Sequence, residues 1–452
     1  MLVAETDFHF ISDLELSQRF VKLLEFDNVI IAVSGGSDSL ALLYLVRLWH
    51  RQQVNRLGLR LRLLGVTIDH GLRVEAKHEV RQIREWTCSI GIEHRSITWY
   101  GDKPVSAVQD TARKTRYQLL KELVLRLPGR SVILTGHTRN DQAETVLMRL
   151  ARGSGAKGLA GIAKCTRIYG YHVLRPLLDL SREELQDYLI SIKVMWLNDP
   201  SNEVLAFERV RIRKKIYARK DLGLEDAALA RTAQRMARTN FALEDIAVRL
   251  LREKAQQNPV LKRYGIFLWE YGTWELPDEI AIRVLRRIVY AIGGHADLPS
   301  LQKTENLLQY ITKNHFRGAT LAGCQCFSRK VGFTTHVLFF RERGRVAPPN
   351  IRFVQAPATA IWDRRFRITI KSMEEKEISV AALGSNLSVL KNKCDLRSIT
   401  QFGIPANALM TLPGFYVNEE LVAVPNLDWG LSSWQISSEF IMQNLFGRHQ
   451  TE

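Results

Sequence analysis

A short polar segment between two apolar runs carries the first residues that could do chemistry. The run NVIIAV at 28–33 is followed by SGGSDS and then by an apolar stretch with helical spacing. Adjacent glycines let backbone N–H groups approach an anion closely, because glycine has no Cβ. Serine hydroxyls can add donors, and a following helix presents the positive end of its dipole. The segment therefore predicts a phosphate-binding loop made of Ser34, Gly35, Gly36, Ser37, Asp38 and Ser39.

Asp38 stands in this loop, and no lysine lies among the glycines as it would in a Walker A loop. A carboxylate beside phosphates is chemically reasonable when it holds Mg²⁺, which then bridges the phosphate oxygens. We therefore expect Asp38 to be a metal ligand at a nucleotide site. The alternative is a serine-rich turn without a ligand, since Gly-Gly turns are common.

Two acids, Asp141 and Glu144, follow the apolar run at 131–137 and lie three residues apart. At this spacing they would share one face of the first turn of a helix. They are candidate catalytic residues, or alternatively acids that only stabilise the positive end of a helix. Arg113 and Arg116 have the same spacing and could face one site, or they could form a solvated basic face.

A basic stretch, RVRIRKKIYARK at 209–220, has seven basic residues and no acid, in a chain of 452 residues with a formal net charge of +17. An excess of this size favours a polyanionic partner, either nucleic acid or an anionic membrane face. Contacts to phosphates would position a nucleic acid without reading its sequence. The alternative is a solvated surface. The candidate contacts are Arg209, Arg211, Arg213, Lys214 and Lys215.

The elements that must position these residues alternate along the first half of the chain. The strand-like runs cover residues 28–33, 63–69, 92–99 and 131–137. The helical patterns cover residues 40–53, 75–90, 105–127 and 142–150. Near-continuous Val, Ile and Leu strands that alternate with helices indicate an α/β fold, a doubly wound parallel sheet covered on both faces. Ser181 and Glu184 form a capping box that predicts a further helix.

Composition changes after residue 220, where a long Ala- and Arg-rich segment at 224–257 has helical periodicity. The charged and Pro-rich segment at 341–350 is typical of a linker. The chain is therefore predicted to have three domains: a catalytic α/β domain, a helical domain and a small α/β domain. Their predicted bounds are 1–217, 218–340 and 351–452.

The five cysteines are sparse, and the pair at 324 and 326 lacks the usual zinc or redox spacing. They are expected to be reduced thiols in a cytoplasmic protein. No apolar run approaches the ~20 residues that a membrane span needs, and the acidic start of the chain does not match a signal peptide. The sequence leaves the oligomeric state open, a homodimer included.

The loop SGGSDS resembles the pyrophosphate loop of ATP pyrophosphatases, which cleave ATP between the α and β phosphates. Further segments are similar, in the same order, to the tRNA(Ile)-lysidine synthetase family within that superfamily. These segments are IDHGLR at 68–73, ARKTRY at 112–117, GHTRNDQAET at 136–145, RLARGSGAKGLAGI at 149–162, RPLL at 175–178 and NDPSN at 198–202.

This resemblance implies a ligase that forms a carbon–nitrogen bond, with ATP and Mg²⁺ as cofactors. The wobble cytidine of an isoleucine tRNA with a CAU anticodon attacks the α-phosphate of ATP, and free L-lysine then displaces AMP from carbon 2. In this reaction Asp38 holds the metal, Arg113 stabilises the phosphate of the intermediate, and Asp141 and Glu144 orient and deprotonate the lysine amine. The basic residues at 209–215 and the helical middle domain bind the tRNA, and the small C-terminal domain recognises it. The codon that this tRNA reads changes from AUG to AUA.

Two positions depart from the family pattern: Asn140 replaces the first aspartate of its paired aspartates, and Val210 replaces an asparagine. The segment at 404–413 resembles the family's C-terminal segment but lacks the expected basic residues. Within the superfamily, a tRNA thiolase would need reactive cysteines, often in C-x-x-C spacing, which is absent, and an amidotransferase would need a domain with a nucleophilic cysteine. A non-catalytic tRNA-binding protein with a vestigial nucleotide loop is the alternative from another class.

Overall fold

The protein is described here by a computed structural model. It covers residues 11–58, 60–69, 76–99, 108–198, 211–212, 225–273, 275–313, 316–344, 347–372, 377–390, 393–394, 399, 401–430 and 435–447. The chain divides into two compact units, Met1–Asn240 and Phe241–Glu452. The three domains expected from the sequence stay a prediction. Within the described ranges, no helix is both long and apolar enough to cross a lipid bilayer.

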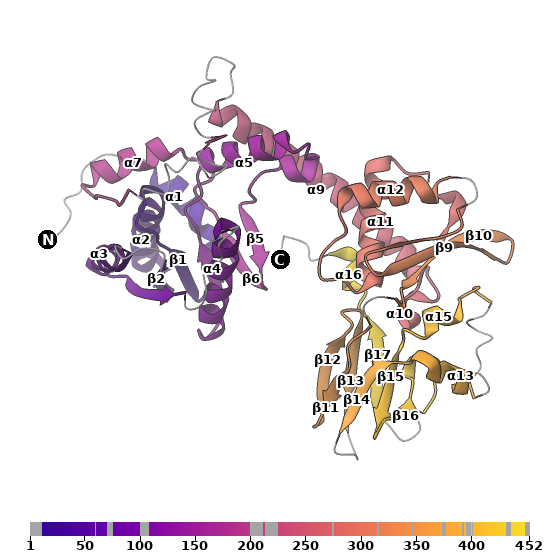
Figure 1. The fold of residues 1–452 in the computed structure, drawn as a ribbon. Helices are drawn as coiled ribbons and strands as arrows, with labels where there is room; N and C mark the ends of the chain where they lie inside the picture. The colour runs from indigo at the N-terminus through magenta and orange to yellow at the C-terminus, as the bar shows by residue number, and fades with distance from the viewer. Residues whose placement is uncertain are drawn as a thin grey trace. The chain divides into compact units, whose positions relative to one another are not determined.

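The first unit is built on a six-stranded sheet with the order β3-β2-β1-β4-β6-β5 (Figure 1). Its strands are β1 (Asn28–Ala32), β2 (Arg62–Asp69), β3 (Glu93–Thr98), β4 (Ser131–Leu134), β5 (Cys165–Ile168) and β6 (Tyr171–Leu174). All neighbours pair in parallel except β5 and β6, which are antiparallel. The four predicted strands are therefore confirmed, and the β5–β6 hairpin is an addition that the sequence pattern did not predict.

Helices cover both faces of this sheet, which confirms the doubly wound fold (Figure 1). Along β1, Val29 and Ile31 belong to one hydrophobic cluster and Ile30 to the other, because alternate side chains of a strand point to opposite faces. The first face is covered by α1 (Asp13–Phe20), α2 (Ser37–Leu57), α3 (Ala76–Ser89) and α7 (Arg182–Ser191). The second is covered by α4 (Val108–Leu125).

The helix starts follow local capping chemistry. The Ser181 hydroxyl accepts a hydrogen bond from the Glu184 N–H, and the Glu184 carboxylate reaches back to the Ser181 N–H, so the predicted capping box is present. Thr138 caps α5 (Arg139–Ala151) in the same way. The short helix α6 (Ala156–Leu159) follows α5, and the 3-10 turn η1 (Val21–Glu25) follows α1.

The long helix α9 (Asp226–Gln256) fulfils the expectation of a periodic helical segment at 224–257. Its first turns carry Leu229 and Ala233, which pack on Ala143 and Val146 of α5. Its later turns contribute to the hydrophobic core of the second unit. One continuous helix thus supplies side chains to the cores of both units.

The second unit combines helices with antiparallel sheets. Two helices, α11 (Asp278–Gly293) and α12 (Leu301–Ile311), accompany a four-stranded sheet that the sequence pattern did not predict. That sheet has the order β7 (Phe267–Glu270), β10 (Thr334–Arg341), β9 (Cys324–Val331) and β8 (Ala319–Leu321).

The remainder of this unit contains two small sheets and short helices. One sheet has the order β11 (Ile351–Phe353), β14 (Ile378–Ala382), β15 (Pro413–Val417) and β16 (Glu420–Ala423). The other has the order β12 (Ala358–Trp362), β13 (Phe366–Ile370) and β17 (Ile436–Phe440). The short helices are α10 (Leu261–Tyr264), α13 (Leu387–Leu390), α15 (Ala406–Leu409) and α16 (Gln443–Phe446). One hydrophobic cluster runs from α9 to α16.

Candidate active site

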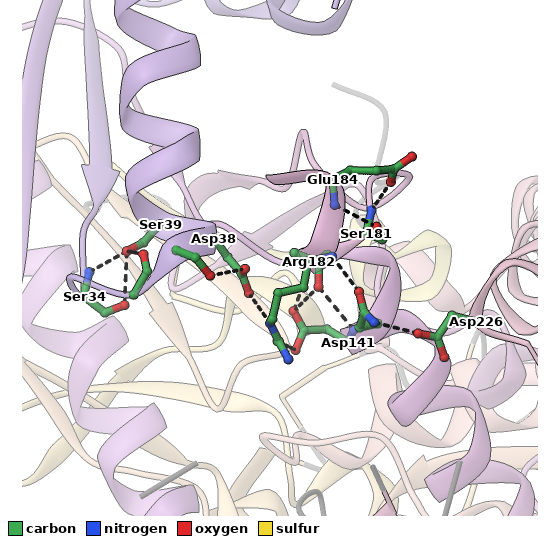
Figure 2. Close-up of polar contacts among 12 residues, drawn as sticks. Ser34, Asp38, Ser39, Asp141, Ser181, Arg182, Glu184 and Asp226 are labelled. Carbon is green, nitrogen blue, oxygen red and sulfur yellow. Dashed lines mark hydrogen bonds and ion pairs between the residues drawn. The ribbon is translucent and has the colours of Figure 1, made fainter. Parts of the chain in front are cut away.

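The predicted phosphate loop lies between the end of β1 and the start of α2, at the carboxyl edge of the parallel sheet, where open α/β sheets bind ligands. The Ser39 hydroxyl organises it (Figure 2). This hydroxyl accepts hydrogen bonds from the Ser34 N–H at 3.1 Å and the Ser34 hydroxyl at 3.2 Å, and it donates to the Gly36 carbonyl at 2.9 Å. The loop is thereby folded back onto the first turn of α2.

The two glycines of the loop differ in backbone conformation and in the space around them. Gly35 has φ +85°, and a Cβ on it would lie 2.7 Å from Leu197 Cδ1, so the fold itself requires glycine there. Gly36 has φ −72°, and a Cβ on it would have the Ser34 Oγ as its nearest neighbour, at 3.8 Å. Open space therefore lies beside Gly36, next to the first N–H groups of α2, which have no partner within the helix. This cradle fits an oxyanion such as phosphate.

The segment after β4 lies against the phosphate loop. A Cβ on Gly136 would lie 2.7 Å from the Asp38 carbonyl oxygen and 3.1 Å from Ser39 Cα. Only glycine permits this approach of two backbones. Two motifs that are about 100 residues apart in the sequence are thus joined at one edge of the sheet.

Asp38, Asp141 and Arg182 form the charged centre of the site (Figure 2). The Arg182 Nε lies 3.1 Å from Asp38 Oδ2, and its Nη2 lies 4.0 Å from Asp141 Oδ1. The three side chains are only 14–24% exposed. Burial raises the pKa of Asp38, although Arg182 acts against this. Burial alone would lower the pKa of Arg182, but Asp38, Asp141 and Glu144 raise it above its ordinary value.

Asp141 combines the two roles that the sequence left open. Its Oδ2 accepts hydrogen bonds from the Thr138 N–H at 2.9 Å and the Thr138 hydroxyl at 3.1 Å, so it does cap α5. Its Oδ1 faces Arg182. Glu144 lies one turn further along α5 and is 1% exposed. The structure therefore brings Asp38, Asp141 and Glu144 around one arginine.

Arg182 and Asn140 are site residues that the sequence pattern did not identify. Arg182 is the first residue of α7, where a cation is unfavourable next to the positive end of the helix dipole. That unusual placement directly after the Ser181 cap was the available signal. Asn140 is 7% exposed; it accepts a hydrogen bond from the Arg182 N–H at 2.8 Å and donates one to Asp226 at 2.6 Å.

Side chains of α5 hold the glycine-rich segment that follows this helix. The Gln142 amide donates to the Ile162 carbonyl at 2.9 Å and accepts from the Ile162 N–H at 2.5 Å. The Arg149 guanidinium donates to the carbonyls of Gly158 and Gly161, at 2.8 and 2.7 Å. The conformation of 158–162 is therefore set from the same helix that carries Asp141.

Other predicted site residues are not joined to this centre. Arg113 is exposed on α4, with its guanidinium carbon 5.3 Å from the centre of the Tyr117 ring. Since α4 covers the face of the sheet opposite α2, a role for Arg113 at the phosphate loop stays a prediction. Arg211 is exposed. The remaining basic candidates, Arg209, Arg213, Lys214 and Lys215, lie outside the described residues, as do residues 70–73 and 199–202.

The donor set at Asp38 fits Mg²⁺ bound together with phosphate. Within the described ranges, no group of three or more His, Cys, Asp or Glu side chains could hold a metal ion unaided. Mg²⁺ in nucleotide sites commonly takes one or two carboxylates and completes its shell with phosphate oxygens and water. Asp38 beside the open cradle at Gly36 meets that requirement.

The chain is similar to known proteins both in its N-terminal part and over most of its length. Residues 11–220 match the family model of the PP-loop domain. A tRNA(Ile)-lysidine synthase of Bradyrhizobium diazoefficiens is 40% identical over 306 residues, which are 66% of this chain and 82% of that protein. A tRNA(Ile)-lysidine synthase of Ruegeria pomeroyi is 33% identical over 396 residues, 87% of each chain. A third, from Mesorhizobium japonicum, is 36% identical over 379 residues, 82% of this chain and 79% of that protein.

Proposed function

The chain belongs to the tRNA(Ile)-lysidine synthase family, and from this premise we propose how its residues carry out the reaction. The enzyme ligates free L-lysine to carbon 2 of the wobble cytidine in isoleucine tRNA with a CAU anticodon. ATP first adenylates the cytidine and pyrophosphate leaves; lysine then displaces AMP. The observation that carries this proposal is the meeting of the phosphate loop with Asp141 and Glu144 around Arg182.

In the first step, negative charge builds up around the α-phosphate. The first N–H groups of α2 are held in place by the helix before the reaction, so they stabilise this charge without reorganisation, while the loop hydroxyls hold the loop in shape. Asp38 is the residue that would hold Mg²⁺, which when bound would supply further positive charge beside the phosphates. We assign Arg113 to the phosphate of the adenylated tRNA. This assignment is supported by the three-residue spacing of Arg113 and Arg116 on α4, which lets both side chains face one site.

In the second step, lysine must react through a neutral amine. The ε-amine of free lysine has a pKa of ~10.4, so it arrives protonated at neutral pH. Asp141 caps α5 through Oδ2 and faces Arg182 through Oδ1, and we assign its carboxylate the task of orienting the ammonium group. Glu144 is buried on the same helix and is the proposed acceptor of the proton.

The tRNA is proposed to contact the basic segment at 209–215, where Arg211 is exposed. The cytoplasm is the proposed location, supported by five cysteines that are all free. A homodimer stays a prediction, as does the middle, helical part of the chain as a tRNA-binding domain.

Incubation of the protein with ATP, labelled lysine and transcribed CAU-anticodon isoleucine tRNA tests the function. We expect lysidine in nuclease digests of the tRNA, with AMP formed in equal amount. The matched control is the methionine tRNA that has the same anticodon, which should stay unmodified. ATP consumption and tRNA binding without any label transfer would contradict the proposal.

Glu144→Gln keeps the shape of the side chain and removes its charge. We expect lysine transfer to slow at least tenfold while adenylated tRNA accumulates, because the second step loses its proton acceptor. Quenched-flow separation of adenylated and lysidine-containing tRNA measures both species. Lysine transfer at the wild-type rate would show that Glu144 is not the proton acceptor.

A further inference from the structure

A single buried amide connects three helix starts in the first unit. Asn140 lies in the first turn of α5, and its carbonyl oxygen accepts a hydrogen bond from the N–H of Arg182, the first residue of α7. Its amide nitrogen donates to Oδ2 of Asp226, the first residue of α9. The distances are 2.8 and 2.6 Å, and Figure 2 shows this path from Arg182 to Asp226.

The chemistry of this position selects asparagine. One end of the side chain must accept from an N–H, and the other must donate to a carboxylate, and an amide does both. An aspartate at 140 would still accept from Arg182, but its second oxygen would face the Asp226 carboxylate at the distance of the present hydrogen bond. Two carboxylates at that distance repel unless they share a proton.

The other end of this path is the charged centre of the site. Asn140 holds the backbone of Arg182, and the Arg182 side chain reaches Asp38 at 3.1 Å and Asp141 at 4.0 Å. A cation at the start of α7 is unfavourable for the helix, so the acids of the site must offset that cost. The side chain of Arg182 therefore serves the site and not the helix that carries it.

Docking of α9 does not depend on the polar contact alone. Leu229 and Ala233 of α9 pack on Ala143 and Val146 of α5, and all four are at most 8% exposed. The contact of Asp226 with Asn140 lies at the end of this apolar contact, beside α7. Loss of the polar contact should thus disturb Arg182 more than it disturbs the association of the two helices.

We propose that Asn140 and Asp226 are positioning residues for the ligation, because they fix the start of α7 so that Arg182 holds Asp38 and Asp141 at their working separation. This inference rests on the proposed function, since it assigns the pair a task in the same site. Neither residue is one of the groups proposed to bind the phosphates or the lysine amine. Their effect passes through Arg182.

Exchanging the amide of Asn140 with the carboxylate of Asp226 tests whether this pair positions Arg182. Asn140→Asp should lower kcat for tRNA-dependent AMP formation at least tenfold, because two carboxylates then face each other. Asp226→Asn should cost threefold or less, since an amide oxygen can still accept from Asn140. The double variant N140D/D226N restores both hydrogen bonds with the partners exchanged, and its kcat should return to within threefold of wild type. KM for tRNA should stay within twofold throughout.

Asn28→Asp is the matched control. Asn28 is a buried amide of the same unit, 4% exposed, at the start of β1 and so at the sheet edge away from the loop. The Asn28→Asp substitution should lower the midpoint temperature of thermal unfolding, but kcat should be unchanged at temperatures below that midpoint. If N140D loses activity only in proportion to its unfolding, or if the double variant is no better than N140D, the pair is structural and the inference is wrong. Failure of the wild type to form lysidine would instead overturn the proposed function.

Discussion

At the residue scale, the phosphate loop shows why two identical residues in sequence need not have the same role. Gly35 is required by backbone conformation and by the packing of Leu197, whereas Gly36 has an ordinary φ and open space beside it. We therefore expect the first glycine to be required by the fold and the second by the bound phosphate. Asp38, next to them, is held by Arg182 from a helix that begins 144 residues later.

The two glycines make a matched pair for substitution. Gly35→Ala should cost about 1–3 kcal/mol of folding stability, because φ +85° is strained for alanine and its methyl group meets Leu197. Gly36→Ala should stay within about 1 kcal/mol of wild type, since its φ suits alanine. KM for ATP should rise for Gly36→Ala, whose methyl group enters the cradle. Urea unfolding and ATP titrations measure both; equal stability losses would contradict this division.

Asp38→Asn removes the charge of the proposed metal ligand and keeps its size. We expect the single-turnover rate of AMP formation at saturating Mg²⁺ to fall by about 100-fold or more, the range found when one electrostatic stabiliser is removed. The Kd for tRNA should stay unchanged, because the proposed contacts to tRNA phosphates lie in the basic segment at 209–215 and not in the phosphate loop. A rate of AMP formation near that of wild type would show that Asp38 is not a metal ligand.

At the element scale, β2 and β3 support the end of β1, from which the loop departs. The Thr67 hydroxyl on β2 donates to the Val33 carbonyl at 2.9 Å. Its oxygen lies 2.9 Å from Nε2 of His94 on β3, and because the one hydroxyl hydrogen is already used, Nε2 must be the donor. A chain of hydrogen bonds thus runs from the sheet edge to the residue before Ser34.

His94, at one end of this chain of hydrogen bonds, makes the stability of the first unit depend on pH. Burial, with a smaller contribution from Arg84, lowers the pKa of His94 to about 4, whereas an unfolded histidine titrates near ~6.5. Between these values the unfolded chain binds a proton that the folded chain does not, so stability falls as pH falls through this range. Each unit of pKa difference corresponds to about 1.4 kcal/mol.

His94→Gln keeps an N–H donor and does not titrate. It should therefore lose less stability than wild type between pH 7 and pH 4.5. Urea unfolding of both proteins at the two pH values provides the comparison, and the wild-type protein at pH 7 is the reference for any direct cost of the substitution. An equal loss in both proteins would assign the acid sensitivity to other groups.

At the scale of the whole molecule, the net charge of +17 fits an enzyme whose substrate is a polyanion. The described parts form two units, and α9 supplies side chains to the core of each. The basic segment at 209–220 precedes this helix in the chain. Electrostatic attraction of tRNA should therefore add to affinity without selecting its sequence.

Arg211, Arg213 and Lys214 provide the test of this attraction. Their combined change to Ala should flatten the plot of log K for tRNA against log salt by about 2–3 units if all three contact phosphates. Both tRNAs with the CAU anticodon should weaken about equally. The control changes Arg51, Arg56 and Arg60 to Ala, exposed residues in or just beyond the last turns of α2, away from the loop. An unchanged slope, or a loss for the isoleucine tRNA alone, would contradict the assignment.

The sequence by itself determined the features that depend on neighbouring residues. The glycines, serines and Asp38 predicted the phosphate loop because their effect on an anion is local. The alternation of apolar runs with helical patterns predicted the doubly wound sheet, and Ser181 with Glu184 predicted the start of α7. The four-stranded sheet at 267–341 was missed, because short runs with mixed burial, such as 267–270, do not differ from loops or helix segments by periodicity.

Only the tertiary structure decided which distant residues meet. Gly136 belonged to a family segment, but its need for glycine appeared only when the Asp38 carbonyl was found against it, and the partners of Arg182 could not be inferred from its placement at a helix start. Asn140 was a departure from a family pattern, and its contact with Asp226, 86 residues away, accounts for the amide. Such contacts depend on how strands and helices pack across the sheet, and the types of neighbouring residues carry no record of that packing.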